Sequence, residues 1–377
     1  MTSAADEAPP RPLILIILAA SVILAGRETL LVMGNQPLGF DLLPLWTAAC
    51  YAFKHPDQIY DFATITRLQA WIIGVHTGPR PWIYPPSALL ALAPFGQAPW
   101  LIAYPAWVAA TLGALCVIVM KRLEGPKWMG LALLILAEPS VLAILVGQVT
   151  FLIGALVLGG LLALRTRPAL AGVLLGCAAL IKPTSLLMLP IGLLASRQWR
   201  AILWTGVTGI VGAGLAALIF GWRTWFAWLA ALPKFDAVIT SDPTLWRGTI
   251  TPTWLLHLAG LDGTPALIIR GALALAGALL TWRVFRATDN APARMTVMIG
   301  ASLLITPYAM FYDAAALAPA AVILLMGPRE GRRWVWALAC YGLAVLAAFP
   351  PVSPIALAAL MGVTALPFLR PVATAPA

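Results

Sequence analysis

The sequence predicts an all-α polytopic membrane protein with about 12 transmembrane helices. Hydrophobic residues make up 61% of the 377 residues and charged residues only 10%, far below the roughly 25% charged residues of soluble domains. The apolar runs are continuous rather than alternating, which favours helices over membrane-spanning strands. Lys and Arg residues are concentrated in the segments between alternate runs, as expected for short loops on one side of a bilayer.

The first apolar run, residues 13–34, is predicted to be a membrane helix rather than a cleaved secretion signal. No small-residue cleavage motif leads from it into a soluble domain. Eleven further apolar runs follow, and with the first they make the 12 predicted segments. They lie near residues 98–120, 128–145, 149–164, 169–181, 184–196, 201–220, 265–283, 292–307, 312–327, 333–349 and 355–369.

The positive charges predict the orientation in the cytoplasmic membrane. With the N-terminus in the cytoplasm, 15 of the 24 Lys and Arg residues fall on the cytoplasmic side, mostly in short loops, and both termini are cytoplasmic. The net charge of +10 then indicates contact with anionic lipids and not with nucleic acid. The 15 residues are Arg11, Lys121, Arg122, Lys127, Arg165, Arg167, Arg197, Arg200, Arg283, Arg286, Arg294, Arg329, Arg332, Arg333 and Arg370.

Two longer external loops, residues 35–97 and 222–263, are expected within one transmembrane domain that covers residues 1–377. Neither loop is polar enough to form a separate soluble domain. In the first loop, apolar residues recur at helical spacing after residue 41 and again within residues 57–74. This pattern predicts two interfacial helices, with Trp46, Trp71 and Trp82 at the depth of the lipid headgroups.

Asp41 lies among apolar residues in "GFDLLPLW", where the first of these helices begins. Its carboxylate has two interpretations, a functional acid or base and the N-cap of the helix, with Pro44 tolerated in the first turn. Arg80 and Tyr84 follow in "RPWIYPP". The Pro-Pro pair disfavours helix there and fixes an irregular backbone near the membrane surface, which could equally be a stiff connector.

The segment around Lys182 and Pro183 predicts a broken helix. Both of its ends are cytoplasmic, and each half has about 13 apolar residues, about 20 Å of helix, which is too short for a hydrocarbon core of about 30 Å. Lys182 then lies below the external surface, where a lone ammonium costs roughly 3 kcal/mol. An anionic partner such as a phosphate would offset this cost. The alternative is that the ammonium extends to the interface.

The isolated polar residues are predicted to converge on one cavity that opens to the outside. Gln148 in "LVGQVTFLIG" ends one predicted helix on the external side, and Tyr308, Tyr312 and Asp313 in "TPYAMFYDAAAL" form another external turn. Asp41, Arg80, Tyr84 and Lys182 lie at a similar depth. The four Cys and three His residues are too scattered to predict a metal site.

The motifs "GFDLLPLWTAA", "IYPP", "GQVTFLIG", "LLGCAALIKPTSLLMLP" and "TPYAMFYDAAAL", in this order, resemble glycosyltransferase family 87 of the GT-C superfamily. That family includes the polyprenyl-phosphate-mannose-dependent mannosyltransferase that elongates phosphatidylinositol mannosides. The resemblance covers about residues 35–320 and implies a GT-C-like bundle. It also implies an inverting hexosyltransferase, which moves mannose or another hexose from a polyprenyl-phosphate carrier to a lipid or glycan acceptor at the external membrane face.

The resemblance also implies residue roles. Asp41 occupies the position of the general base in the first external loop, and Lys182 with Arg80 would stabilise the phosphate leaving group. No cofactor is implied, although Asp57 and Asp61 could still bind a divalent cation. Family members often have a His before the Tyr-Asp pair, which is absent here, so His55, His76 or His257 could take its place. The expected substrate contacts are Tyr84, Gln148, Tyr308, Tyr312, Asp313, Trp46 and His55.

Two other functions are compatible with a polytopic protein of this kind. A lipid-linked-sugar transporter or flippase would be expected to carry polar sites through the whole membrane depth. Here the predicted helices are almost free of charge apart from Arg27, Glu28 and Arg270. A non-catalytic GT-C-like assembly subunit is the second alternative, and the presence of both Asp41 and Lys182 argues against it.

Overall fold

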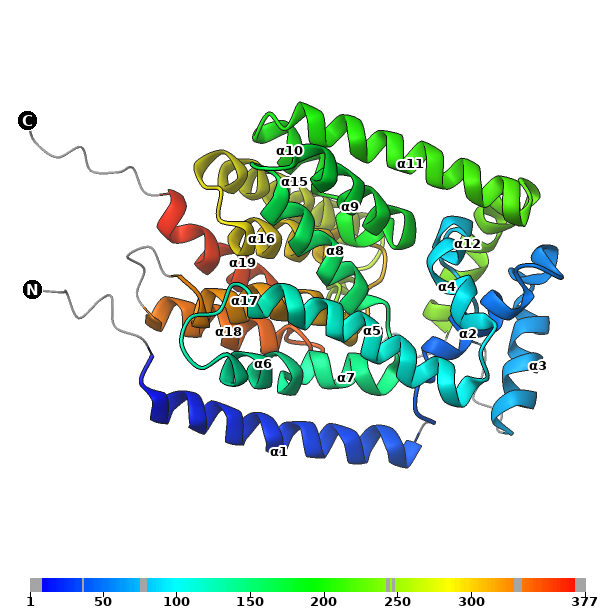
Figure 1. The fold of residues 1–377 in the computed structure, drawn as a ribbon, viewed down its shortest axis with the longest axis horizontal. Helices are drawn as coiled ribbons and strands as arrows, with labels where there is room; N and C mark the ends of the chain where they lie inside the picture. Colours follow the sequence, from blue (N-terminus) through cyan, green and yellow to red (C-terminus); the bar gives the residue numbers. More distant parts are fainter. Residues whose placement is uncertain are drawn as a thin grey trace, which may run out of the picture.

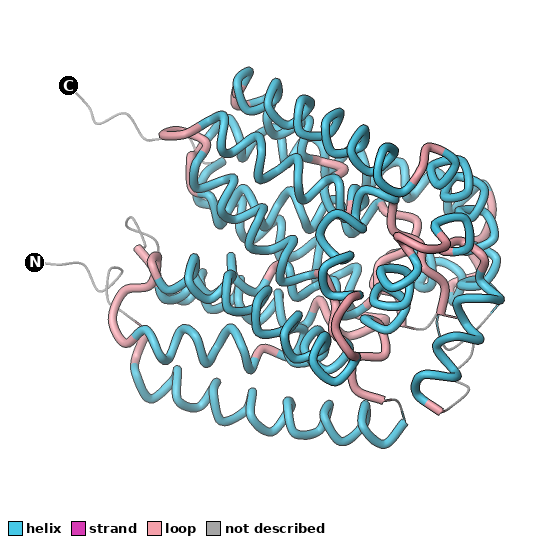
Figure 2. Tube along the Cα trace, turned by 45° about the vertical axis from the view of Figure 1, so that its right-hand side comes forward, coloured by secondary structure: helices cyan, strands magenta, loops and turns pink. Residues whose placement is uncertain are grey.

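The computed structural model describes residues 9–35, 37–74, 80–241, 245, 248–328 and 334–369. Within these ranges the chain forms helices joined by turns, and the only strand-like pairing is an isolated bridge between Thr249 and Met310 (Figures 1 and 2). The prediction of an all-helical chain is confirmed.

Among the described residues, four helices are long and apolar enough to cross a bilayer on their own. They are α1 (Arg11–Asn35), α5 (Trp100–Met120), α11 (Trp199–Phe220) and α15 (Thr264–Ala287). A fifth crossing results if α6 (Lys127–Leu136) and α7 (Glu138–Val146), which meet at a bend of 63°, form one broken span. Pro139 in the first turn of α7 explains this break, because its ring cannot continue the preceding helix.

Every one of the 12 predicted segments contains helix, but the count of 12 spanning helices is not confirmed. The other apolar helices in these segments are too short to qualify as spans by length, because even 17 residues cover only about 25 Å. They are α8 (Thr150–Ala163), α9 (Pro168–Ile181), α10 (Leu189–Ala195), α16 (Ala291–Ile305), α17 (Ala318–Met326), α18 (Trp334–Leu346) and α19 (Ser353–Leu369).

The break predicted at Lys182 and Pro183 is confirmed. Helix α9 ends at Ile181, the 3-10 helix η3 (Pro183–Leu186) follows, and α10 begins at Leu189. Helix α9 packs closely along α11, because a Cβ on Gly172 would lie only 2.5 Å from the carbonyl oxygen of Ala201. Small residues at such positions let helix backbones approach each other in a membrane, and here they let α9, the helix that ends just before Lys182, pack against α11.

The segment predicted to be the first external loop contains α2 (Leu42–Tyr51), η1 (Pro56–Gln58), α3 (Phe62–Ile73), η2 (Pro86–Ala88) and α4 (Leu89–Gly96). Helices α2 and α3 are the two predicted helices, and α2 packs inside the protein rather than on its surface. Seven of its ten residues are buried, and Trp82 is also fully buried. The reason is close packing of α2 on α4, where a Cβ on Gly96 would lie 2.6 Å from the backbone of Ala49. Trp71 on α3 is 81% exposed.

The segment predicted to be the second external loop contains α12 (Arg223–Ser241) and α14 (Pro252–Leu258). Figure 1 shows α12 beside α2 and α4 at one end of the bundle, whereas α1 begins and α19 ends at the opposite end. The backbone after α12 pairs with the turn before η4 (Phe311–Ala316), because Ile250 N–H donates to Ala309 O (2.8 Å) and Phe311 N–H donates to Gly248 O (3.1 Å). Segments far apart in sequence thus meet at this end.

Candidate active site

Asp41 is positioned by the turn that precedes α2. The N–H groups of Gly39 and Asp41 donate to the carbonyl oxygens of Leu145 (2.8 Å) and Val146 (3.0 Å), which lie in the last turn of α7 and have no partner within that helix. Gly39 has φ of +75°, and a Cβ there would lie 2.7 Å from the Tyr104 ring, so only glycine fits. The "GFD" turn therefore docks on the C-terminal end of α7.

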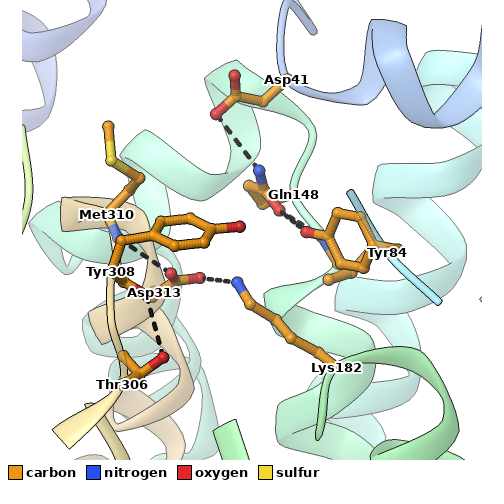
Figure 3. Close-up of polar contacts among 9 residues, drawn as sticks. Asp41, Tyr84, Gln148, Lys182, Thr306, Tyr308, Met310 and Asp313 are labelled. Carbon is orange, nitrogen blue, oxygen red and sulfur yellow. Dashed lines mark hydrogen bonds and ion pairs between the residues drawn. The ribbon is translucent and has the colours of Figure 1, made fainter. Parts of the chain in front are cut away.

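The carboxylate of Asp41 does not cap α2. Asp41 occupies the N-cap position, yet its side chain makes no capping hydrogen bond. Instead, Oδ1 accepts from Nη1 of Arg80 (3.3 Å) and Oδ2 accepts from Nε2 of Gln148 (3.3 Å); the second bond is drawn in Figure 3. The N-cap interpretation is therefore wrong for the side chain, which lines a cavity.

Opposing effects set the proton affinity of Asp41. Burial raises the pKa of this carboxyl above its ordinary value, whereas the charge of Arg80 and the hydrogen bonds from Tyr312 and Gln148 lower it. Because burial is the largest effect, the carboxylate is a stronger base than an exposed Asp. Such a raised pKa suits a group that must take up a proton near neutral pH.

Gln148 can present only its amide NH₂ group to Asp41. Its Oε1 accepts from the Tyr84 hydroxyl (3.0 Å) and from the N–H of Val149 (3.2 Å) (Figure 3). Gly147 ends α7 in the left-handed region with φ of +76° and turns the chain so that Gln148 follows directly. The two acceptor bonds fix the amide, and its NH₂ group therefore faces the carboxylate.

The segment that carries Arg80 and Tyr84 is held by side chains from other elements. Its Pro-Pro pair leaves the backbone irregular, and three of its carbonyl oxygens are satisfied by side-chain donors. The carbonyls of Arg80, Ile83 and Tyr84 accept from Gln69 (2.8 Å), Trp228 (2.9 Å) and the Tyr60 hydroxyl (2.7 Å). The segment thus has both predicted properties, a stiff connection and a fixed pair of polar side chains.

Lys182 is paired with a carboxylate inside the protein. It follows the last residue of α9, and its ammonium forms an ion pair with Oδ1 of Asp313 (Figure 3). Oδ2 of Asp313 accepts from the N–H of Met310 (3.0 Å). The side chains of Lys182 and Asp313 are only 12% and 4% exposed. The alternative that Lys182 extends to the membrane interface is therefore wrong.

These residues surround a cavity of about 300 Å³, at the lower end of the size range of ligand sites. The ring of Tyr308 projects into the space between Asp41 and Lys182 (Figure 3). Eight of the ten residues selected from the sequence line this cavity, namely Asp41, Arg80, Tyr84, Gln148, Lys182, Tyr308, Tyr312 and Asp313.

Trp46 and His55 are not brought to the cavity. Trp46 follows Asp41 by five residues, about 140° around a helix, and its indole N–H donates to the carbonyl of Ala98 (3.0 Å). His55 is exposed before η1, and its ring lies 5.4 Å from that of Tyr51. His257 contacts Asp262 (3.0 Å) on the protein surface, and His76 lies outside the described residues. No described histidine therefore lines the cavity.

The structure adds an apolar wall that the sequence analysis did not identify. Phe235, Val238 and Ile239 of α12 line the cavity, and the Phe235 ring lies 4.8 Å from that of Tyr308. Their i, i+3, i+4 spacing is the signal that could have indicated an inward helix face. Across the described residues, no group of three or more His, Cys, Asp or Glu side chains is arranged to hold a metal ion.

Comparison with known proteins identifies the family. The profile of glycosyltransferase family 87 matches residues 82–307. A polyprenol-phosphate-mannose-dependent alpha-(1-2)-phosphatidylinositol pentamannoside mannosyltransferase of Mycolicibacterium smegmatis is 27% identical over 353 residues, covering 89% of this chain and 82% of that protein. The Mycobacterium tuberculosis protein of the same name is 25% identical over 316 residues, covering 78% and 69%.

No solved structure matches the chain. The family profile covers more than half of the sequence, including "IYPP", Gln148 and Lys182. The protein therefore belongs to glycosyltransferase family 87.

Proposed function

We propose that this protein transfers mannose, or another hexose, from a polyprenyl-phosphate carrier to a lipid or glycan acceptor. Membership of glycosyltransferase family 87 supports a transferase, and both relatives are named as enzymes that depend on polyprenol-phosphate-mannose. The reaction inverts the anomeric centre and takes place at the external face of the cytoplasmic membrane. The observation that carries the proposal is the Asp41 carboxylate, which lines the cavity instead of capping α2.

Asp41 acts as the general base. An acceptor hydroxyl attacks the anomeric carbon from the side opposite the phosphate while its proton passes to the carboxylate. The bond between the anomeric carbon and the phosphate oxygen breaks, and polyprenyl phosphate leaves. Positioned general bases contribute typically 10²–10⁴-fold to a rate. The contacts from Arg80 and Gln148 hold the carboxylate in one orientation for this proton transfer.

Lys182 and Arg80 bind the donor phosphate. An ammonium has three N–H donors and a guanidinium has five, so both can bind a phosphate oxygen without releasing Asp313 and Asp41. Charge that develops on the leaving group is then stabilised by cations already in place. Tyr84, Tyr308 and Tyr312 supply ring faces and hydroxyl groups for the sugar, and the apolar wall of α12 suits the start of the prenyl chain.

The proposed architecture is one GT-C-type domain over residues 1–377. The start of α1 and the end of α19 lie at the end of the bundle opposite α2, α4 and α12 (Figure 1). This arrangement supports cytoplasmic termini and a cavity that faces the exterior, as the distribution of Lys and Arg predicts.

The test is transfer of label by the purified protein in proteoliposomes. Wild type is mixed with polyprenyl-phosphate-[¹⁴C]mannose and a total membrane lipid extract, and the labelled products are separated and their anomeric configuration is determined by NMR. The proposal expects labelled glycolipid with the configuration opposite to that of the donor. Label that crosses the bilayer on the intact carrier, with no glycolipid formed, would replace the transferase with a transporter.

A further inference from the structure

A second groove lies beside the catalytic cavity. It has a volume of about 520 Å³ and is formed by η1, the start of α3 and the N-terminal half of α12. Asp57, Tyr60 and Phe62 line it from the first external loop, and Ala231 and Lys234 line it from α12. The reaction proposed above uses none of these residues.

One face of α12 joins the groove to the catalytic cavity. Ala227 and Ala231 line the groove, whereas Phe235 and Ile239 line the cavity. These four residues are spaced by four, so they lie on one side of the helix within an arc of about 120°. From Ala227 to Ile239 the helix rises about 18 Å at 1.5 Å per residue. The two spaces therefore lie along a single track beneath α12.

We propose that this groove binds the headgroup of the acceptor and that the track beneath α12 guides an acceptor hydroxyl to Asp41. The inference rests on the proposed function. The catalytic cavity has about 300 Å³ for the donor sugar and its phosphate, so the bulk of an acceptor needs a separate place. The groove lies at the end of the bundle where Figure 1 shows α12 beside α2 and α4.

The lining of the groove suits a polyhydroxylated headgroup such as a sugar or a cyclitol. Asp57 and Lys234 are exposed, and neither forms an ion pair with another described residue. Asp57 can accept hydrogen bonds from hydroxyl groups, and Lys234 can donate to hydroxyl or phosphate oxygens. Asp61 is less available, because its carboxylate already accepts from Ala63 N–H (3.2 Å) and from the Thr64 hydroxyl (2.6 Å).

Aromatic rings complete the groove and connect it to the active site. Tyr60 and Phe62 line the wall. Phe62 is partly exposed and offers apolar surface to the C–H groups of a sugar ring, whereas Tyr60 is only 7% exposed. The Tyr60 hydroxyl donates to the carbonyl of Tyr84 (2.7 Å), so the wall of the groove and the segment that lines the catalytic cavity are held together. This bond fixes the position of the groove wall relative to the catalytic cavity.

The test compares acceptor and donor titrations of groove variants. Ala230→Trp fills the groove at an exposed position of α12, and Leu229→Trp places the same ring on the outer face, where Leu229 is 54% exposed. Asp57→Asn and Lys234→Met remove the charges on the two sides, and Lys54→Met, at an exposed position outside the groove, is the charge-matched control. Initial transfer rates are measured against total lipid extract at saturating polyprenyl-phosphate-mannose, and then against donor at saturating extract.

We expect Ala230→Trp to raise the apparent acceptor KM at least tenfold and Asp57→Asn and Lys234→Met to raise it severalfold, with donor KM within twofold of wild type. Leu229→Trp and Lys54→Met should match wild type in both titrations. An unchanged acceptor titration in the three groove variants, or a rise in donor KM instead, overturns the inference. If wild type itself transfers no sugar, the proposed function fails, and this outcome is distinct from failure of the groove inference alone.

Discussion

The cavity contains two pairs of a carboxylate and a cation. The two carboxylates differ in their exposure and in the length of their contacts. Asp313 binds Lys182 through one oxygen and the backbone N–H of Met310 through the other, and its side chain is only 4% exposed. Asp41 is 16% exposed and is held at 3.3 Å by both Arg80 and Gln148. The comparison indicates that Asp313 fixes the position of Lys182, whereas Asp41, which is more exposed and held by longer contacts, is the carboxylate that can also accept a proton from a substrate.

The largest effect on stability is expected from breaking the buried pair. Lys182→Met leaves the Asp313 carboxylate without its cation, and loss of one partner of a buried pair typically costs about 3–5 kcal/mol. Thermal unfolding in detergent should show a clear fall in Tm for Lys182→Met and a smaller one for Arg80→Met, whose partner is more exposed. The double variant Lys182→Met/Asp313→Asn should recover part of the loss. If it is no more stable than Lys182→Met alone, the two residues are not energetically coupled.

The next effect concerns the pH dependence of transfer. Burial raises the pKa of Asp41 and the charge of Arg80 lowers it. Since the proposed base works only when ionised, transfer should fall as the pH drops through this pKa. Arg80→Met removes the lowering charge, so the acid limb of the kcat/KM profile should move to higher pH. An acid limb that stays in place in Arg80→Met would show that the Asp41 carboxyl does not control it.

A smaller shift in the same direction is expected for Gln148→Met. This change removes a neutral donor to Asp41 rather than a full charge, so the acid limb should move less than in Arg80→Met. Tyr84→Phe is the matched control, because the N–H of Val149 still orients the Gln148 amide when the tyrosine hydroxyl is absent. An equal shift in Tyr84→Phe would mean that the tyrosine hydroxyl, and not the Val149 N–H, orients the Gln148 amide.

The smallest effects should come from the two predicted residues that lie away from the cavity. Trp46→Phe and His55→Ala are expected to leave donor KM within about twofold of wild type, because neither side chain lines the cavity. The measurement is a donor titration in the transfer assay. A large rise in donor KM for either variant would place part of the donor site outside the cavity.

The charged part of the site could be predicted because isolated charges are conspicuous in an apolar sequence. Asp41 and Lys182 each lie where burial of an unpaired charge is costly. The helix break at Pro183, directly after Lys182, points to the same residue. The partner of Lys182 is 131 positions away in the chain, and no local pattern could pair it with Asp313. Phe235, Val238 and Ile239 were missed because apolar residues that line a cavity resemble those that face lipid. The count of 12 spans is not confirmed, because apolar runs in the sequence do not distinguish a crossing helix from a 14-residue helix such as α8.

The central claim is that the Asp41 carboxylate takes the proton from the acceptor. It is tested most directly by single-turnover transfer with Asp41→Asn at saturating donor and acceptor, together with the Kd of polyprenyl-phosphate-mannose. The amide keeps the size of the side chain and cannot act as the base. We expect the rate to fall by at least about 10²-fold with the donor Kd within twofold of wild type. Transfer by Asp41→Asn at the wild-type rate would contradict the account.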